Sequence, residues 1–279
     1  MDNNITINSP VIPTGNINQG TVAIESSRAT AEALGKLMLA KQSPRDVVAA
    51  YTRVAQACQR IGIAEKAFYS YQRSGTTVTG VTIRFAEELA RCWGNIDFGL
   101  KELSRDNGKS EMQAYAWDTE TNTISQQTFT VLHVREKNKT TYNLTSEREI
   151  YENNTNYGSR RLRSRILAIL PSDLVDMAIE ECKKTLNNQI NGINNAPLID
   201  YIKNLVIRFE NLGVKKEDIE QRANKKVENF DRDDYVEYVG ILNSIGTKET
   251  KASEWFSSMK PDISTTAKDL SNALKGGKA

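Results

Sequence analysis

Residues 96–118 of the 279-residue chain read IDFGLKELSRDNGKSEMQAYAWD, and this stretch carries the clearest structural pattern in the sequence. Apolar residues recur at every second position on both sides of Asp106-Asn107-Gly108, as in two strands that each bury one face. Asn-Gly between two such runs is the strongest short-range signal for a β-hairpin. A second turn near Thr119–Asn122 and renewed alternation over Thr128–Arg135 extend the pattern. The sequence therefore predicts a three-stranded antiparallel meander over Asn95–Arg135.

Helical patterns and one short strand precede the meander. Residues 26–42 have helical spacing after a capping serine, and residues 43–62 have Ser43 as N-cap, Pro44 at the first helical position and Gly62 as a stop. Alternating aromatic residues predict a strand over Lys66–Arg73. Helical spacing returns over residues 79–95, where Gly94 is the expected C-terminal residue.

The chain after the meander is predicted to be mostly helical. Residues 136–156 are polar and favour a loop, with a short helix beginning at the capping pattern of residues 145–149. Helical periodicity follows over Tyr157–Leu170, and Pro171 opens another helix that runs to about Leu186. The stretch NNQINGINNAP (187–197) is typical of a connection between domains. Three further helices are predicted within residues 196–213, 215–224 and 231–246.

Together these elements predict an α+β fold. A three-stranded antiparallel β meander packs with helices in a β-β-β-α core, N-terminal helices precede it, and a small all-helical unit follows. The predicted organisation is a flexible arm over residues 1–24, a core over 25–190, a helical C-terminal domain over 197–256 and a flexible tail over 257–279.

Composition favours a water-soluble globular protein, with 39% hydrophobic and 26% charged residues. No apolar run approaches the roughly 18 to 20 residues that span a bilayer. The N-terminus lacks the basic and apolar regions of a secretory signal, so a cytoplasmic location is expected. Cys58, Cys92 and Cys182 fit neither a disulfide framework nor zinc-ligand spacing, and are expected to be reduced and buried.

Motifs for catalysis are weak in this sequence. There is no GxxxxGK[ST] segment to hold a nucleotide triphosphate. The single histidine, His133, is more simply a strand residue with satisfied hydrogen bonds than a catalytic base. Acidic residues that could hold Mg²⁺ are scattered over the predicted strands, where solvated strand faces explain them more simply: Asp97, Glu102, Glu111 and Asp118.

Positive charge is concentrated in the middle of the chain. The net charge is only +2, yet residues 135–165 hold eight Lys and Arg against four Glu, whereas residues 198–256 hold ten basic against twelve acidic residues. An uneven distribution of this kind is what a nucleic-acid footprint requires when the whole molecule is nearly neutral.

Four of these basic residues lie in NYGSRRLRSRILAIL (156–170). On a helix at about 100° per residue, the apolar residues Leu162, Ile166, Ile169 and Leu170 share one side. The helix can therefore dock by that edge and present guanidinium groups outward. An ordinary surface helix is the simpler alternative, but four arginines without a lysine, and without a carboxylate in the same segment, favour phosphate contact or base stacking. The loop before this segment adds Arg135, Lys137 and Lys139, and we call it the basic loop. Together with the aromatic residues of the strands, these features indicate binding of single-stranded nucleic acid.

The order of these elements resembles the single-strand annealing proteins of phage recombination, the RecT/Redβ group, which share a β-β-β-α core. The segments that carry the resemblance are residues 68–99, 110–122 and 156–186. In that group the helix after the meander carries a basic pattern close to K/R-x-L-R-x-K, which here falls on Arg160, Leu162, Arg163 and Arg165. The resemblance implies that these three arginines contact DNA phosphates.

Further candidate DNA-binding residues follow less directly, since the loops of this chain differ from those of the group in length and character. They are Arg161, Tyr157, Arg135, Lys137, Lys139 and Arg73.

The resemblance implies a function without covalent chemistry. Such proteins bind single-stranded DNA as rings or helical filaments and anneal complementary strands to a duplex without ATP in homologous recombination and repair. No enzyme activity or cofactor is expected, no metal site is predicted, and Mg²⁺ is at most a modulator of annealing. The C-terminal helical unit resembles domains that dock an exonuclease or the host single-strand binding protein, inside a bacterial cell and away from membranes.

Two alternatives remain open at this point. One is a metal-dependent DNA nuclease that uses Asp97, Glu111 and Asp118. The other is a basic RNA-binding or structural oligomer. The length of DNA strands after incubation with the protein and Mg²⁺ distinguishes a nuclease from an annealing protein, which leaves it unchanged. The affinities for single-stranded DNA and for RNA of the same sequence distinguish the RNA-binding alternative.

Overall fold

The predicted meander is present in the computed structural model, which describes residues 19–73, 76–137, 140–189 and 198–259. Strands β3 (Ile96–Asp106), β4 (Lys109–Asp118) and β5 (Thr123–Leu132) form an antiparallel sheet in the order β3-β4-β5. Asn107 and Gly108 have φ angles of 48° and 73°, as the tight turn of this hairpin requires. The third strand begins five residues before the predicted Thr128. The fold class predicted from the sequence, α+β, is confirmed.

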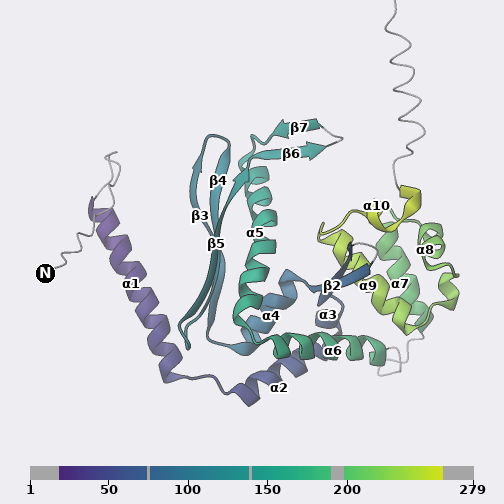
Figure 1. Ribbon diagram of the computed structural model, residues 1–279, viewed down its shortest axis with the longest axis horizontal. Coiled ribbons are helices and arrows are strands. Elements are labelled where there is room, and N and C mark those ends of the chain that lie inside the picture. The colour runs from purple at the N-terminus through teal and green to yellow at the C-terminus, as the bar shows by residue number, and fades with distance from the viewer. Residues whose placement is uncertain (1–18, 74–75, 138–139, 190–197, 260–279) are drawn as a thin grey trace, which may run out of the picture.

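One long helix, α5 (Glu147–Ile169), covers one face of this sheet (Figure 1). Alternate residues of β4 are buried, from Ser110 to Asp118, as expected for a strand that turns one face to a helix. Helix α5 approaches strand β3 closely at Gly158, where an added Cβ would lie 2.6 Å from the Leu100 side chain. A glycine at this point lets α5 lie against the sheet.

The prediction of a mainly polar loop over residues 136–156 is wrong, although a helix does begin at the predicted capping pattern, with Ser146 as its N-cap. Helix α5 begins at Glu147 and runs through to Ile169 without a break. Its first turns are held by two buried amides: Asn153 donates to the Leu132 carbonyl at 3.1 Å, and Asn154 donates to the Ser110 hydroxyl at 2.9 Å. These contacts to the sheet outweigh the low helix propensity of asparagine. Before α5, strands β6 (Val134–Lys137) and β7 (Thr140–Asn143) form a hairpin.

The N-terminal part differs from the prediction at its boundaries. Helix α1 (Gln19–Gln42) already begins inside the predicted arm, and helix α2 (Val47–Cys58) is capped by Asp46, whose carboxylate accepts from Ala49 N, in place of Ser43. Gly62 does not end a helix but lies in α3 (Ile61–Ala64). The predicted strand is β1 (Phe68–Arg73), and it pairs with a strand that the sequence pattern did not reveal, β2 (Thr76–Val81). Helix α4 (Ile83–Trp93) then ends at Gly94 as predicted.

The helices after α5 follow the predicted order. They are α6 (Ser172–Gln189), α7 (Leu198–Glu210), α8 (Lys216–Ala223) and α9 (Arg232–Gly246). A short helix that was not predicted, α10 (Ala252–Trp255), follows them, and there are 3₁₀ turns at Val227–Asn229 and, within the predicted tail, at Ser257–Met259. Residues 260–279 of the predicted tail and residues 190–197 of the predicted linker lie outside the described residues. None of the described helices has the length and apolar character needed to cross a membrane.

Helix α9 packs on the β1–β2 hairpin, and this contact sets the position of the site. An added Cβ at Gly240 would lie 2.5 Å from the Ser70 hydroxyl oxygen. Asn243 donates to the carbonyls of Glu65 and Phe68 at 2.6 and 2.8 Å. The C-terminal helices thus lie on the side of α5 away from the sheet (Figure 1). The turn that follows α9, residues 247–249, reaches the arginine-bearing part of α5.

Candidate nucleic-acid interface

The arginine helix docks by the edge predicted from its sequence. Leu162, Ile166 and Leu170 are buried in the core. The four arginines, however, are not all presented outward. The Arg160 side chain is 50% exposed, whereas the Arg163 side chain is only 13% exposed. The C-terminal end of α5 is therefore enclosed by the rest of the protein on more sides than an isolated surface helix would be.

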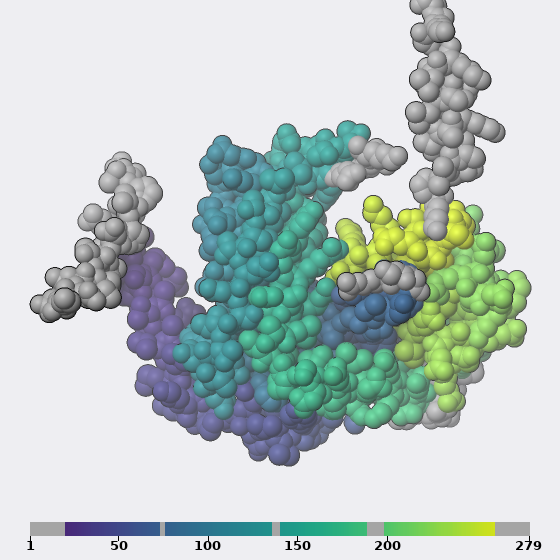
Figure 2. Space-filling model, in the orientation of Figure 1, coloured from purple at the N-terminus to yellow at the C-terminus, as the bar shows by residue number. Residues whose placement is uncertain are grey.

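A pocket of about 360 Å³ opens beside this part of α5. One wall is α5, with Asn156, Tyr157, Ser159, Arg160 and Arg163; the other is the turn after α9, with Thr247, Lys248 and Glu249, and Ile83 of α4 completes it. We call it the arginine pocket. Figure 2 shows a hollow here, between the teal surface of α5 and the yellow surface of the C-terminal helices.

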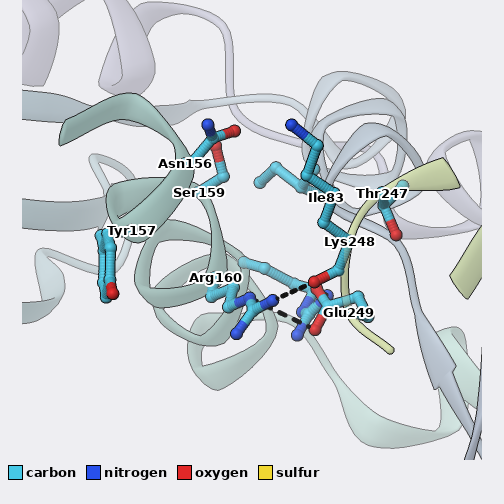
Figure 3. Close-up of a pocket in the computed structure, with 9 residues that line it drawn as sticks. Ile83, Asn156, Tyr157, Ser159, Arg160, Thr247, Lys248 and Glu249 are labelled. Carbon is cyan, nitrogen blue, oxygen red and sulfur yellow. Dashed lines mark hydrogen bonds and ion pairs between the residues drawn. The ribbon is translucent and has the colours of Figure 1, made fainter. Parts of the chain in front are cut away.

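Glu249 bridges two of the candidate arginines across the pocket. Its Oε1 lies 2.7 Å from Nη1 of Arg163, and its Oε2 lies 3.4 Å from Nε of Arg160. Arg160 also donates from Nη2 to the Lys248 carbonyl at 2.5 Å, as the dashed lines of Figure 3 indicate. Residues 156–170 hold no carboxylate that could pair with these arginines, but Glu249, which lies 86 positions after Arg163, supplies one.

Lys248 is a candidate site residue that the sequence reasoning missed. Its side chain is exposed and extends away from Glu249, toward the side of the pocket where Asn156 lies (Figure 3). Its ammonium has no hydrogen-bond partner among the described residues. Lys248 has a left-handed backbone conformation with φ of 59°, which is uncommon for a residue with a side chain. No local sequence pattern marks this lysine, because it acquires its neighbours only when α9 packs on β1.

Aromatic rings lie beside the arginines. The Arg163 guanidinium lies over the Tyr69 ring at 4.7 Å from its centre, and Tyr69 stacks on Tyr71 with ring centres 5.9 Å apart. Burial raises the pKa of the Tyr69 phenol, and the charge of Arg163 acts in the opposite direction. Tyr157 differs from this pair because it is 51% exposed on the α5 wall. It is the ring best placed to stack on a ligand.

Arg161 and Arg165 do not line the arginine pocket. The Arg161 guanidinium lies 4.3 Å from the centre of the Phe129 ring and donates to the Tyr157 carbonyl at 3.0 Å. The Nε atom of Arg165 is buried without a hydrogen-bond partner in the described structure. The basic pattern carried over by resemblance is therefore split: Arg160 and Arg163 line the pocket, whereas Arg165 is half-buried outside it.

The remaining candidates lie on other elements. Arg135 in β6 lies 3.6 Å from Glu149 in an ion pair. Arg73 ends β1 and Lys137 ends β6, and their side chains are outside the described structure, as is the whole of Lys139. The structure therefore brings together Arg160, Arg163 and Tyr157, and leaves the contribution of the basic loop as a prediction.

His133 lies in a buried polar cluster under α5. The Ser110 hydroxyl lies 2.7 Å from Nε2 of His133 and donates to the Glu102 carboxylate at 2.7 Å. Because Ser110 has one proton, which Glu102 accepts, the hydroxyl accepts from His133 and from Asn154. A serine arranged in this way is not activated by the histidine. The cluster pairs buried polar groups between α5 and the sheet. His133 is hydrogen-bonded as expected, but it lies in the bend between β5 and β6 and not in a strand.

The three carboxylates of the nuclease alternative do not converge. Asp97 lies opposite Trp117, and Asp118 lies opposite Ile96, so the two side chains project from opposite faces of the sheet. Asp97 pairs with Lys36 at 3.0 Å, and Asp118 pairs with Arg45 at 2.9 Å. Glu111 lies seven residues along β4 from Asp118, about 20 Å away. In the described parts of the chain, no three His, Cys, Asp or Glu side chains are placed to hold a metal ion.

The arginine pocket carries an excess of positive charge. Its walls carry three cationic side chains, Arg160, Arg163 and Lys248, against the single carboxylate of Glu249. The cysteines take no part, since Cys58, Cys92 and Cys182 are free and buried, as predicted. An anion such as a phosphodiester is the ligand that suits this charge.

Comparison of the chain with protein-family models, curated proteins and solved structures finds no match.

Proposed function

We propose that this chain binds single-stranded DNA at the arginine pocket and anneals complementary strands without ATP, as a homo-oligomer. The observation that carries the proposal is the pair of exposed cations on facing walls, Arg160 on α5 and Lys248 on the turn after α9, in a pocket that Arg163 also lines. Cations that face one opening from two walls suit successive phosphates of a nucleic-acid backbone.

The exposed Tyr157 ring supports binding that does not depend on sequence. It is 51% exposed and lies on the same wall as Arg160. A tyrosine can stack on any base, because every base has an aromatic face. Phosphates held by Arg160 and Lys248, with bases resting on or near Tyr157, would leave the pairing edges of the strand open to a complementary strand.

The annealing step and its phage context are supported by the sequence resemblance to the RecT/Redβ group. The chain order β3, β4, β5 and α5 agrees with the β-β-β-α core that the resemblance implies, with the β6–β7 hairpin placed between β5 and α5. No covalent step is involved, so the protein acts by holding one strand in a conformation that pairs.

Assembly into an oligomer is supported by α1. Ile24, Leu34 and Met38 of this helix are 68%, 55% and 60% exposed. Their spacing of ten and four residues puts them on one side of a helix. An apolar stripe of this kind is expected to bury itself against a second subunit. Sedimentation velocity with and without an oligonucleotide measures the assembly directly, and a protein that stays monomeric in both conditions contradicts this part of the proposal.

The site is tested with the double variant Arg160→Gln/Lys248→Gln. We expect it to lose at least about tenfold in affinity for a labelled single-stranded oligonucleotide, measured by fluorescence anisotropy. The slope of log affinity against log salt should fall by about 1.4, since each single-strand phosphate contact contributes about 0.7. The matched control is Lys183→Gln/Lys184→Gln on α6, which removes the same charge from a surface outside the pocket.

Annealing is tested with the same proteins and complementary oligonucleotides in the absence of ATP. The wild type and the α6 control should accelerate duplex formation, and the pocket variant should not. Equal binding by the two double variants would place the DNA elsewhere, and no acceleration by the wild type would refute the annealing function. Shortening of the strands with Mg²⁺ would support the nuclease, and preference for RNA of the same sequence would support the RNA-binding oligomer.

A further inference from the structure

The contact between Glu249 and the two arginines has the geometry of a bound phosphate. Each carboxylate oxygen takes a different guanidinium, at 2.7 Å to Arg163 and 3.4 Å to Arg160. Carboxylate and phosphate oxygens are interchangeable partners for such pairs, because both accept charge-assisted hydrogen bonds from guanidinium groups. In the free protein, Glu249 therefore occupies the position at which the two arginines would bind a phosphate.

The carboxylate is enclosed enough for its charge to matter. The Glu249 side chain is 14% exposed and that of Arg163 is 13% exposed, so solvent and salt screen their interaction less than they screen a surface pair. Arg160, at 50% exposed, is reached from the pocket mouth. A ligand can approach through Arg160 before it meets Arg163.

The turn that carries Glu249 is held firmly at both ends. Glu249 N donates to the Ser244 carbonyl at 2.9 Å, and the hydroxyls of Ser244 and Thr250 lie 2.8 Å apart. Thr250 also accepts from Nε1 of Trp255 at 2.8 Å. The left-handed Lys248 between these anchors is the kind of backbone conformation that persists only where its surroundings impose it. The backbone thus holds Glu249 in place, and its side chain is the part free to turn away.

We infer that Glu249 is an internal counter-anion that a nucleic-acid phosphate displaces from Arg160 and Arg163. This inference rests on the proposed function. In the free protein the carboxylate keeps the arginines aligned and offsets one of their two positive charges, and the incoming phosphate must compete with it. Weak anions and isolated phosphates therefore do not displace Glu249 from the arginines. A nucleic-acid strand that also binds Lys248 and Tyr157 does displace it. Glu249 therefore determines how strongly a ligand must bind before it can occupy this site.

The test compares Glu249→Gln with Glu237→Gln in the intact chain. Glu237 is the matched control because it lies on α9, is 44% exposed and pairs with Arg222, away from the pocket. We expect Glu249→Gln to raise the affinity for a single-stranded oligonucleotide about tenfold and to steepen the salt dependence, because the pocket gains one net positive charge. Glu237→Gln should bind as the wild type does.

A second variant, Glu249→Ala, removes the hydrogen-bond acceptor as well as the charge, and should change the affinity in the same direction. Urea denaturation of each variant allows affinities to be compared per folded molecule. Unchanged or weaker binding by both Glu249 variants would overturn the inference, because Glu249 would then only position the arginines. That outcome leaves the proposed function intact, whereas absence of binding by the wild type as well refutes the proposed function itself.

Discussion

Two ion pairs of similar length join distant parts of this chain, and they differ in what surrounds them. Arg45 and Asp118 are 73 residues apart and meet at 2.9 Å; Arg163 and Glu249 are 86 residues apart and meet at 2.7 Å. The first pair is almost fully buried, with side chains 6% and 5% exposed. The second is 13% and 14% exposed and borders the arginine pocket.

The partners of Arg45 and Asp118 are all supplied by the fold. Arg45 also donates to the carbonyls of Trp93 and Gly94, at 3.1 and 2.8 Å, and lies over the Trp93 ring. Asp118 accepts further bonds from the backbone N–H groups of Glu120 and Thr121. Within the described structure, the Glu249 carboxylate has only the two arginines as partners. An ion pair fixes the fold where the chain satisfies both charged groups, whereas a pair that borders a pocket leaves its carboxylate within reach of a competing anion.

The largest effect is expected from breaking the buried pair. Arg45→Ala leaves Asp118 charged and enclosed, which should lower the free energy of unfolding by about 3 kcal/mol. Urea denaturation followed by circular dichroism measures the loss. Arg53→Ala is the control, since this exposed arginine makes one bond, to the Cys92 carbonyl, and should cost less than about 1 kcal/mol. Equal losses for the two variants would show that the buried pair of Arg45 and Asp118 stabilises the fold no more than the single hydrogen bond of Arg53 does.

A smaller effect is expected at Glu88, which resembles Glu249 in pairing with two arginines. Glu88 is 7% exposed and contacts Arg60 and Arg91, whose own side chains are 57% and 69% exposed. Glu88→Gln should lower the free energy of unfolding by about 1 kcal/mol, because both arginines can turn to water. Affinity for single-stranded DNA should not change. A rise in affinity equal to that of Glu249→Gln would mean that general charge, not the pocket, controls binding.

The smallest effect is expected at Glu102, the most exposed of these carboxylates, at 31%. A hydrogen bond from Arg105 lowers the pKa of Glu102 below its ordinary value of 4.5, and Ser110 adds to the effect. A carboxylate whose pKa is lower in the folded state stabilises the fold above its unfolded pKa, and this contribution disappears as pH falls through the folded pKa. As the pH falls below 4.5, the Glu102→Gln variant should therefore lose less free energy of unfolding than the wild type loses. The difference between the two losses should be under about 1 kcal/mol. Melting temperatures from pH 3 to 7 check this, and parallel curves would contradict it.

Local patterns were sufficient wherever short-range chemistry decides the conformation. Asn107-Gly108 adopts the left-handed turn that its residue types favour, and the strands on either side pair as the alternation predicts. Helix α9 and its neighbours also lie where helical spacing places them. Such elements were predictable because a turn residue or an apolar periodicity acts within a few positions of the chain.

Other elements depend on contacts that no local pattern contains. The first ten residues of α5 are polar and Asn-rich, and they are helical because Asn153 and Asn154 bond to the sheet. Strand β2 is recognisable only once it pairs with β1. In both places, hydrogen bonds to residues distant in sequence or in a neighbouring strand outweigh intrinsic propensity.

The docking edge of α5, with Leu162, Ile166 and Leu170, and the positive charge of this helix are visible in the sequence alone, because helical periodicity is a local property. Which arginines reach a pocket depends instead on how distant parts of the chain pack together. Arg165 is half-buried outside the pocket, Arg160 and Arg163 pair with Glu249, and Lys248 lies beside them on the turn after α9. These relations depend on how α9 packs on β1, since charges separated by more than eighty residues become neighbours only through packing.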